Sequence, residues 1–273
     1  MTSINTNVGA LNSRRSAVNS TGQMEKAMER LSSGLRVNSA SDDAAGLAVA
    51  GKMEAQLRGI NMAIRNNQDA VGLIQTAEAG LNEVRNMVLR IRELAVQMAN
   101  GIYEDTPDRD NAQLEVTALI NQVSLIAGYT RFNDISLLNG SFDSVEIQAG
   151  NTTTEKIVVT IDDMTASGGL AISAASVATQ AGAQAAITTM DSALETIATE
   201  QATLGSLINR FNFSVNNLSK ASVATEQAVG RIMDADFAQE TTNLSKQQIL
   251  NQAATSMLAQ ANQAKQSILA LLQ

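Results

Sequence analysis

The sequence predicts a mainly α-helical protein in which long antiparallel coiled-coil helices come from both ends of the chain, with a small β-hairpin inserted between them. Hydrophobic residues make up 44% of the 273 residues and aromatic residues only 3%, so Ala, Leu, Ile, Val and Met supply most of the apolar surface. The single proline, Pro107, leaves long segments free of a residue that breaks helices. Apolar residues also recur at alternating steps of three and four, which is the spacing of a coiled-coil seam.

Each end of the chain carries a narrow, alanine-rich seam of this kind. Such a stripe buries little area, and at roughly 25 cal/mol per Å² an isolated terminal helix hardly offsets the entropy lost on ordering. We therefore expect residues 1–42 and 234–273 to be disordered in the monomer and to become helical when many subunits bring their stripes together. The predicted assembly seam consists of Ile4, Val8, Leu11, Val18, Leu250, Ala254, Met257, Ala261, Ile268 and Leu271.

Two longer seams predict a helical rod domain over residues 43–233. The first seam runs from Leu57 to Met98, and the second runs from Ile187 to Ile232 in strict alternation of three and four. At a rise of 1.5 Å per residue, the second segment would form a rod of roughly 70 Å. A helix of that length needs a partner helix beside it to bury its apolar face.

The long seam pattern ends near Asn100, and the sequence after it shows shorter helical and strand patterns. A turn that contains Pro107 precedes a shorter helical pattern, which we expect to end at Gly128. An Asn-Gly turn and alternating β-branched residues predict one or two β-hairpins over about 137–165. The stretch from Thr165 to Ala186 is rich in Ala, Ser, Thr and Gly, so we expect mainly loop with some helix there.

The composition gives little support to catalysis or metal binding. The chain has no Cys and no His, which removes disulfides, thiolate metal sites and the commonest general base. Three acidic clusters lie at predicted helix starts or turns, where carboxylates usually cap free amides. We therefore predict no catalytic, cofactor-binding or metal-binding residue, and no enzyme activity. The clusters are Asp42 with Asp43, Asp105 with Asp108 and Asp110, and Asp162 with Asp163.

Charge and hydropathy narrow the choice of partner and location. The net charge of −8 without a basic block disfavours nucleic acid and anionic membranes as partners. No window of about 18 apolar residues occurs, and the first 30 residues lack the apolar segment of a secretory signal. The chain is therefore expected to be cytoplasmic or exported by a route that needs no signal peptide.

The text RLSSGLRVNSASDDAAGLAVA at Arg30 to Ala50 closely resembles the N-terminal signature of bacterial flagellin. The resemblance covers nearly the whole chain except about Ser141 to Ala186. It continues at the C-terminus with LGSLINRFNFSVNNL, RIMDADFAQE, KQQILNQAATSMLAQAN and LALLQ. Further matches are INTN at Ile4 to Asn7, QTAEAGLNEV at Gln75 to Val84, RIRELAVQMANG at Arg90 to Gly101, and FNDISLLNG at Phe132 to Gly140.

This resemblance implies a structural subunit that assembles with itself into the extracellular flagellar filament used for motility. The chain ends would form inner-core helices and the long central seams a surrounding layer. The short middle implies a flagellin without a large outer domain. The resemblance further implies export through the flagellar type III apparatus, a chaperone on the C-terminal segment near Ile249 to Leu272, and filament cap and hook-associated proteins as neighbours.

The segment RELAVQ also resembles the surface by which the flagellin-sensing Toll-like receptor of animals detects some flagellins. The matching positions are Arg90, Leu94 and, in QLEVT, Glu115. Leu89 departs from the Gln that is common in well-detected flagellins. The same residues could instead pack subunits together, and the two roles are compatible.

Two other interpretations stay open at this level. A hook-filament junction protein shares helical ends with flagellin, although the continuous match through RELAVQ and LAQAN favours flagellin. A lipid-surface amphipathic protein would also carry apolar stripes at its ends. That class needs a wider apolar face and flanking Lys or Arg, which are scarce here.

Overall fold

The computed structural model describes residues 6–270, with side chains described through residue 264, and its predominantly helical architecture confirms the predicted fold class. The chain divides into two compact units. One is formed by the chain ends, Met1–Leu57 with Val223–Gln273, and the other by Arg58–Ser222. The helices are α1 (Val8–Ser33), α2 (Ala44–Met98), the short π-helical segment η1 (Asp105–Arg109), α3 (Asp110–Tyr129), α4 (Gln180–Met233) and α5 (Phe237–Ala270).

Local capping sets the limits of the first helix. Asn7 precedes α1 and accepts the Ala10 N–H through its side chain at 3.1 Å, which satisfies one of the free amides of the first turn. Gly34 ends α1 with a left-handed φ of 73°, which glycine adopts without the penalty that a Cβ would bring. The Gly34 carbonyl then accepts the Ala235 N–H at 2.9 Å, which joins the two ends of the chain.

The acidic cluster at the start of α2 has the structural role that the sequence predicts. Asp43 Oδ1 accepts the Gly46 N–H at 2.9 Å, as an N-cap does. Asp42 accepts the backbone N–H and the hydroxyl of Ser39. These hydrogen bonds, that from the Ser39 hydroxyl first, lower the pKa of the Asp42 carboxyl. Beside this turn, Val37, Ala50 and Met233 form a small apolar cluster.

In the second unit, α2 and α4 run antiparallel in one constant register. Hydrogen bonds join Asn61 to Ser222 and Asn82 to Gln201, while Arg92 forms an ion pair with Asp191. As the residue number rises along α2, it falls along α4 by the same steps. This confirms the antiparallel pairing expected of the two long seams.

The core of this unit is built from the predicted seam residues. On α2 the fully buried members include Ile74, Leu81 and Ile91, and on α4 they include Met190, Ile197, Leu204 and Phe211. Each large apolar side chain of this kind contributes about 1.5–3 kcal/mol when it is fully buried. α3 adds Val116, Val123 and Ala127 to the same core.

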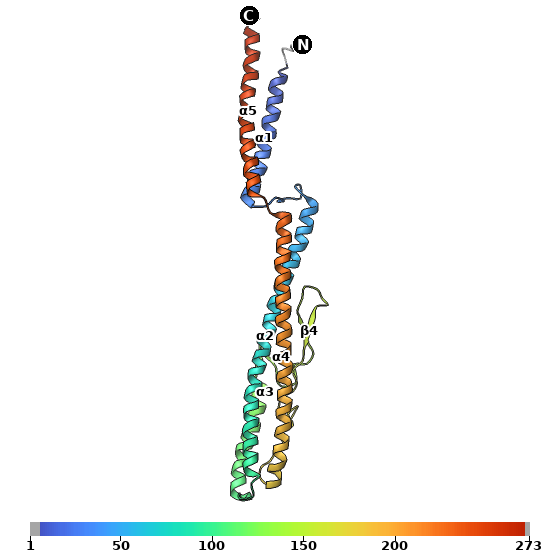
Figure 1. Cartoon of the computed structure of the whole chain (residues 1–273), viewed down its shortest axis with the longest axis vertical. Helices are drawn as coiled ribbons and strands as arrows, with labels where there is room; N and C mark the ends of the chain where they lie inside the picture. The colour runs from blue at the N-terminus through green and yellow to red at the C-terminus, as the bar shows by residue number, and fades with distance from the viewer. Residues whose placement is uncertain (1–5, 271–273) are drawn as a thin grey trace. The chain divides into compact units, whose positions relative to one another are not determined.

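The β structure consists of two short antiparallel hairpins. One pairs β1 (Arg131–Phe132) with β2 (Ile135–Ser136), and the other pairs β3 (Val145–Gln148) with β4 (Lys156–Val159). The second hairpin lies within the predicted region, and β4 runs beside the long helices (Figure 1). The first hairpin was not predicted. In β4, Ile157 and Val159 are buried while Val158 is exposed, which is the alternation that a half-buried strand requires.

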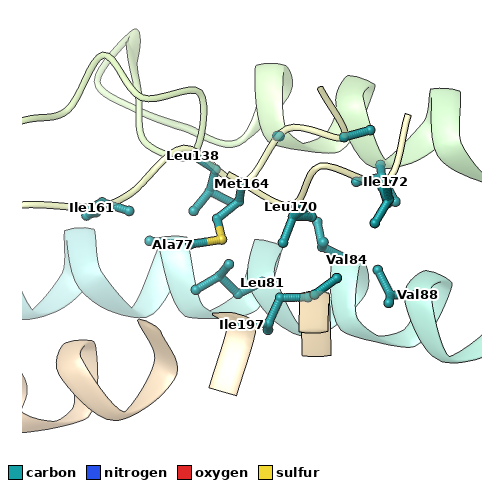
Figure 2. Packing of buried hydrophobic residues seen from close by; sticks show 14 of the residues in the cluster. Ala77, Leu81, Val84, Val88, Leu138, Ile161, Met164, Leu170, Ile172 and Ile197 are labelled. Atoms are coloured by element: carbon teal, nitrogen blue, oxygen red, sulfur yellow. The ribbon is translucent and has the colours of Figure 1, made fainter. Parts of the chain in front are cut away.

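The segment after β4 contributes more to the core than its composition indicates. Ile161, Met164, Leu170 and Ile172 of this segment lie over α2 and point toward it, together with Leu138 from the chain before β3, as Figure 2 shows. The predicted loop from Thr165 to Ala186 is therefore largely a packed cover, and α4 already begins within it at Gln180. The expected helix end at Gly128 is also displaced slightly, since α3 continues to Tyr129.

Gly80 marks a close approach between α2 and the chain that follows α3. A Cβ on Gly80 would lie 2.6 Å from Thr130 Oγ1 and 2.9 Å from Leu138 Cδ1. We predict that Gly80→Ala destabilises the protein by about 1–3 kcal/mol, because overpacking outweighs the gain in helix propensity. Urea unfolding followed by circular dichroism measures the change.

Gly72→Ala is the matched control on the same helix, because nothing lies within 4 Å of a Cβ there. This substitution should stabilise the protein by up to about 1 kcal/mol through helix propensity alone. Equal effects of the two substitutions would contradict the close approach at Gly80.

Candidate functional site

The chain ends meet as an antiparallel pair of helices. Asn7 Nδ2 donates to the Ala261 carbonyl at 3.0 Å, and Asn251 Nδ2 donates to Thr21 Oγ1 at 2.7 Å. At the far end of the pair, Arg30 Nη1 forms an ion pair with Glu240 Oε1 at 3.1 Å. Figure 1 shows α1 and α5 side by side along most of their length.

Small and polar side chains make most of the contact between these helices, together with the larger apolar residues Met24, Leu31, Leu244 and Leu258. They recur at helical steps of three and four, so each helix turns one row toward its partner. Short side chains allow the two backbones to approach but bury little apolar area. The buried or partly buried row on α1 is Ala10, Ser13, Ala17, Ser20, Met24, Ala27 and Leu31, and the row on α5 is Glu240, Leu244, Gln247, Asn251, Ala254, Leu258 and Ala261.

The structure divides the predicted assembly seam between two surfaces. Ala254 is only 8% exposed and Ala261 is partly buried, so both lie in the contact between α1 and α5. The larger members face solvent: Val8, Leu11, Val18, Leu250 and Met257 are 44–64% exposed. Ile4, Leu271 and the Ile268 side chain lie outside the described residues.

Sequence reasoning missed most of the row that joins α1 to α5. It followed the large apolar residues, whereas the close approach of the helices uses Ser, Ala and Asn. The signal that could have found this row is the spacing of small residues at Ala10, Ser13, Ala17, Ser20 and Ala27. We name the exposed residues Val8, Leu11, Val18, Leu250 and Met257 the outer apolar surface. Apolar side chains that gather on the exposed sides of a helix pair are typical of a surface that another protein covers.

The receptor-recognition candidates lie where α2 passes α3. Arg90 Nε donates to Glu115 Oε1 at 3.0 Å, and Arg90 Nη1 donates to Glu93 Oε2 at 3.3 Å. The hydrogen bond to Glu115, followed by that to Glu93, raises the pKa of the Arg90 guanidinium. Arg90 and Glu115 are both about half exposed, but Leu94 is only 4% exposed and belongs to the core. The structure thus brings two of the three candidates together on the surface and places the third beneath them.

The other acidic clusters make local structural contacts. Asp105 forms an ion pair with Arg109, whose guanidinium also donates to the Met98 and Asn100 carbonyls. Asp163 accepts the Thr165 N–H at 2.9 Å. Across the described part of the chain, no group of three or more His, Cys, Asp and Glu side chains could hold a metal ion. Nor does this part contain a helix with the length and apolar character needed to span a membrane.

Comparison with known proteins identifies the family. The model of the bacterial flagellin N-terminal helical region matches residues 4–143, and that of the C-terminal helical region matches residues 187–272. A flagellin of Halalkalibacterium halodurans is 41% identical over 272 residues, which cover 98% of this chain and 99% of the relative. A flagellin of Bacillus subtilis is 36% identical over 301 residues, with the same two coverages.

A solved structure agrees with these matches. The crystal structure of Bacillus cereus flagellin aligns with a TM-score of 0.50 and 32% identity, covering 56% of this chain and 88% of the other. The two family-model matches contain all of α1 and α5, the pair that carries the outer apolar surface. The chain therefore belongs to the bacterial flagellin family, and it is a structural subunit of the flagellar filament outside the cell rather than an enzyme.

Proposed function

We propose that the outer apolar surface of α1 and α5 is where neighbouring copies of this chain pack in the filament. The observation that carries this proposal is the exposure of Leu11, Val18 and Met257, at 55%, 64% and 58%, outside the rows that α1 and α5 turn toward each other. Covering one such side chain contributes about 1.5–3 kcal/mol, and a helical polymer repeats this gain at every subunit.

The proposal extends to the predicted division of the chain. Residues 1–42 and 234–273 form the inner-core helices and order on assembly, while residues 43–233 form the surrounding rod. The fully buried members of the two rows support this division: Ser20, Ala27, Glu240 and Ala254 are small or polar, so they give the lone pair of helices little apolar burial to offset their ordering entropy. The short hairpin region leaves no large outer domain between α3 and α4.

The proposal also covers export and the accessory partners of the subunit. The subunit passes through the flagellar type III apparatus without a cleaved signal peptide, and an export chaperone covers the segment near Ile249 to Leu272. Within that segment Ile249 is 66% exposed and Leu250 is 44% exposed, and a chaperone would shield both before assembly. The filament cap and hook-associated proteins contact the same helices at the filament ends.

The exposed pair of Arg90 with Glu115 is also a recognition site for the flagellin-sensing Toll-like receptor. The pair offers both charges on adjacent helices, and the buried Leu94 positions α2 beneath it. Leu89 at the neighbouring position is partly buried, so it adds little polar surface to this site. Both roles of the region, subunit packing and receptor binding, use the same exposed face.

The assembly proposal predicts the effect of Leu11→Ser. Loss of one apolar contact per subunit should raise the critical concentration for polymerisation about tenfold, because 1.4 kcal/mol corresponds to a factor of ten. Sedimentation of polymer from a dilution series of purified protein measures this concentration. Leu11→Met keeps the apolar contact and serves as the matched control, with a critical concentration close to that of the wild type.

A Leu11→Ser protein that polymerises at the wild-type concentration would contradict the proposed contact. Leu250→Ser tests the α5 side of the surface in the same assay. Because both residues are exposed in the monomer, neither substitution should change the thermal unfolding of the α2–α4 core.

The receptor proposal predicts that Arg90→Ala weakens binding to the receptor ectodomain about tenfold or more, as expected when an anchoring arginine is truncated. Surface plasmon resonance with monomeric protein measures the affinity. Arg58→Ala removes an exposed arginine elsewhere on α2 and should leave the affinity unchanged. Unaltered binding by Arg90→Ala and Glu115→Ala would remove these residues from the proposed site.

A further inference from the structure

Methionine is the side chain of this protein that oxidants attack most readily. The chain has eleven methionines and no cysteine, histidine or tryptophan that would compete for an oxidant. The thioether sulfur takes one oxygen atom from hydrogen peroxide: the O–O bond breaks, two electrons pass from the sulfur to the peroxide, and water leaves. The sulfoxide that forms is polar, so it disrupts an apolar interface that contains methionine. The position of each methionine therefore decides what its oxidation does.

Burial separates the methionines into shielded and accessible groups. Met164 of the second unit is fully buried, and Figure 2 shows its side chain pointing toward α2 from the segment after β4. Met62 and Met257 are 47% and 58% exposed, so peroxide reaches them without any unfolding. In the described part of the chain, the exposed group is Met28, Met62 and Met257, and the buried group is Met98, Met164, Met190 and Met233.

Met257 is the exposed methionine that belongs to the outer apolar surface. It follows Leu250 by seven residues, about two turns of α5, so the two side chains share one face of the helix. Ala254 and Ala261, about one turn away on either side, lie in the contact with α1, and Met257 borders that contact. Oxidation of Met257 would therefore change the surface that the proposed assembly uses and leave the rows between α1 and α5 intact.

We propose that Met257 is an oxidation site that controls assembly. Peroxide converts it to the sulfoxide in the free subunit, and the modified subunit packs poorly against its neighbours. This inference rests on the proposed assembly surface, because Met257 affects polymerisation only if neighbouring subunits cover it. In the polymer the same contact shields the sulfur, so this position is sensitive to oxidants before assembly and resistant afterwards. Methionine sulfoxide reductases reverse the modification.

Peptide mass spectrometry after peroxide treatment of the monomer and of the polymer tests the accessibility of Met257. In the monomer it should oxidise about tenfold faster than the buried Met164 and Met190, because susceptibility follows exposure. In the polymer its oxidation should slow by about the same factor, since neighbours would cover it. Oxidation of Met257 at the same rate in both states would overturn the proposal.

Polymerisation of the peroxide-treated protein tests the consequence. Treatment of the wild type should raise the critical concentration about tenfold, as the loss of one apolar contact per subunit does. Met257→Leu keeps an apolar side chain without a sulfur, so treatment should leave its critical concentration unchanged. Met62→Leu removes an exposed methionine on α2 and is the matched control, with the response of the wild type. Equal rises in the treated wild type and the treated Met257→Leu would overturn the site.

Enzymatic reduction separates oxidation of Met257 from irreversible damage. The two methionine sulfoxide reductases, one for each epimer, with dithiothreitol as the reductant, should return the critical concentration of the treated wild type to its original value. Thermal unfolding of the α2–α4 core should be the same before and after treatment, because Met164 and Met190 are shielded there. A critical concentration that stays raised after complete reduction would overturn the proposal.

Comparison with Leu11→Ser separates the failure of this inference from the failure of the assembly surface. A raised critical concentration for Leu11→Ser, with an unchanged one for the oxidised wild type, would overturn the oxidation site alone and leave the outer apolar surface in place. Wild-type polymerisation by both proteins would overturn the surface, and the oxidation site with it.

Discussion

The contact between α1 and α5 is the interaction on which the proposed assembly of this protein depends. Its rows combine alanine, serine and other polar residues with Met24, Leu31, Leu244 and Leu258, and one partly buried ion pair joins Arg30 to Glu240. Other large apolar residues of the same helices face outward. On the proposal above, the chain ends are held weakly within one subunit, and the larger hydrophobic gain comes from contacts between subunits.

The second unit, in contrast, is held together by a core of large apolar side chains. Its core uses Ile, Leu, Met and Phe side chains from three helices, and the segment after β4 covers them with further large residues. Such a core is stable without a neighbour, because each fully buried side chain contributes about 1.5–3 kcal/mol. The proposal thus combines a rod that is stable in the monomer with chain ends that gain stability from neighbouring subunits.

Periodicity predicted the helical part of the fold because the long helices bury a strict row of large residues. The seam from Ile187 to Ile232 is buried or partly buried at every predicted position, and it pairs with the α2 seam in one register. The cover formed by Leu170, Ile172 and Val177 was not predicted, because an irregular backbone has no period by which its buried residues can be recognised. The short β1–β2 hairpin was not predicted for a related reason, because strands of two residues are too short to show alternation.

The candidate sites were predicted less completely than the fold. The structure places Arg90 and Glu115, which the resemblance pointed to, on an exposed face, but the sequence could not show that Leu94 lies in the core. The assembly seam was chosen by side-chain size, and five of its members face solvent while Ala254 and Ala261 join α1 to α5.

Hydrogen exchange of backbone amides, measured by mass spectrometry on the monomer and on the assembled polymer, tests the central claim most directly. If α1 and α5 are stabilised mainly by contacts between subunits, their amides should exchange rapidly throughout both helices in the monomer and slowly in the polymer. The buried stretches of α2 and α4 should be protected in both states. Monomer α1 and α5 amides protected as strongly as those of α2 and α4 would contradict this claim, because the chain ends would then be stable without neighbours.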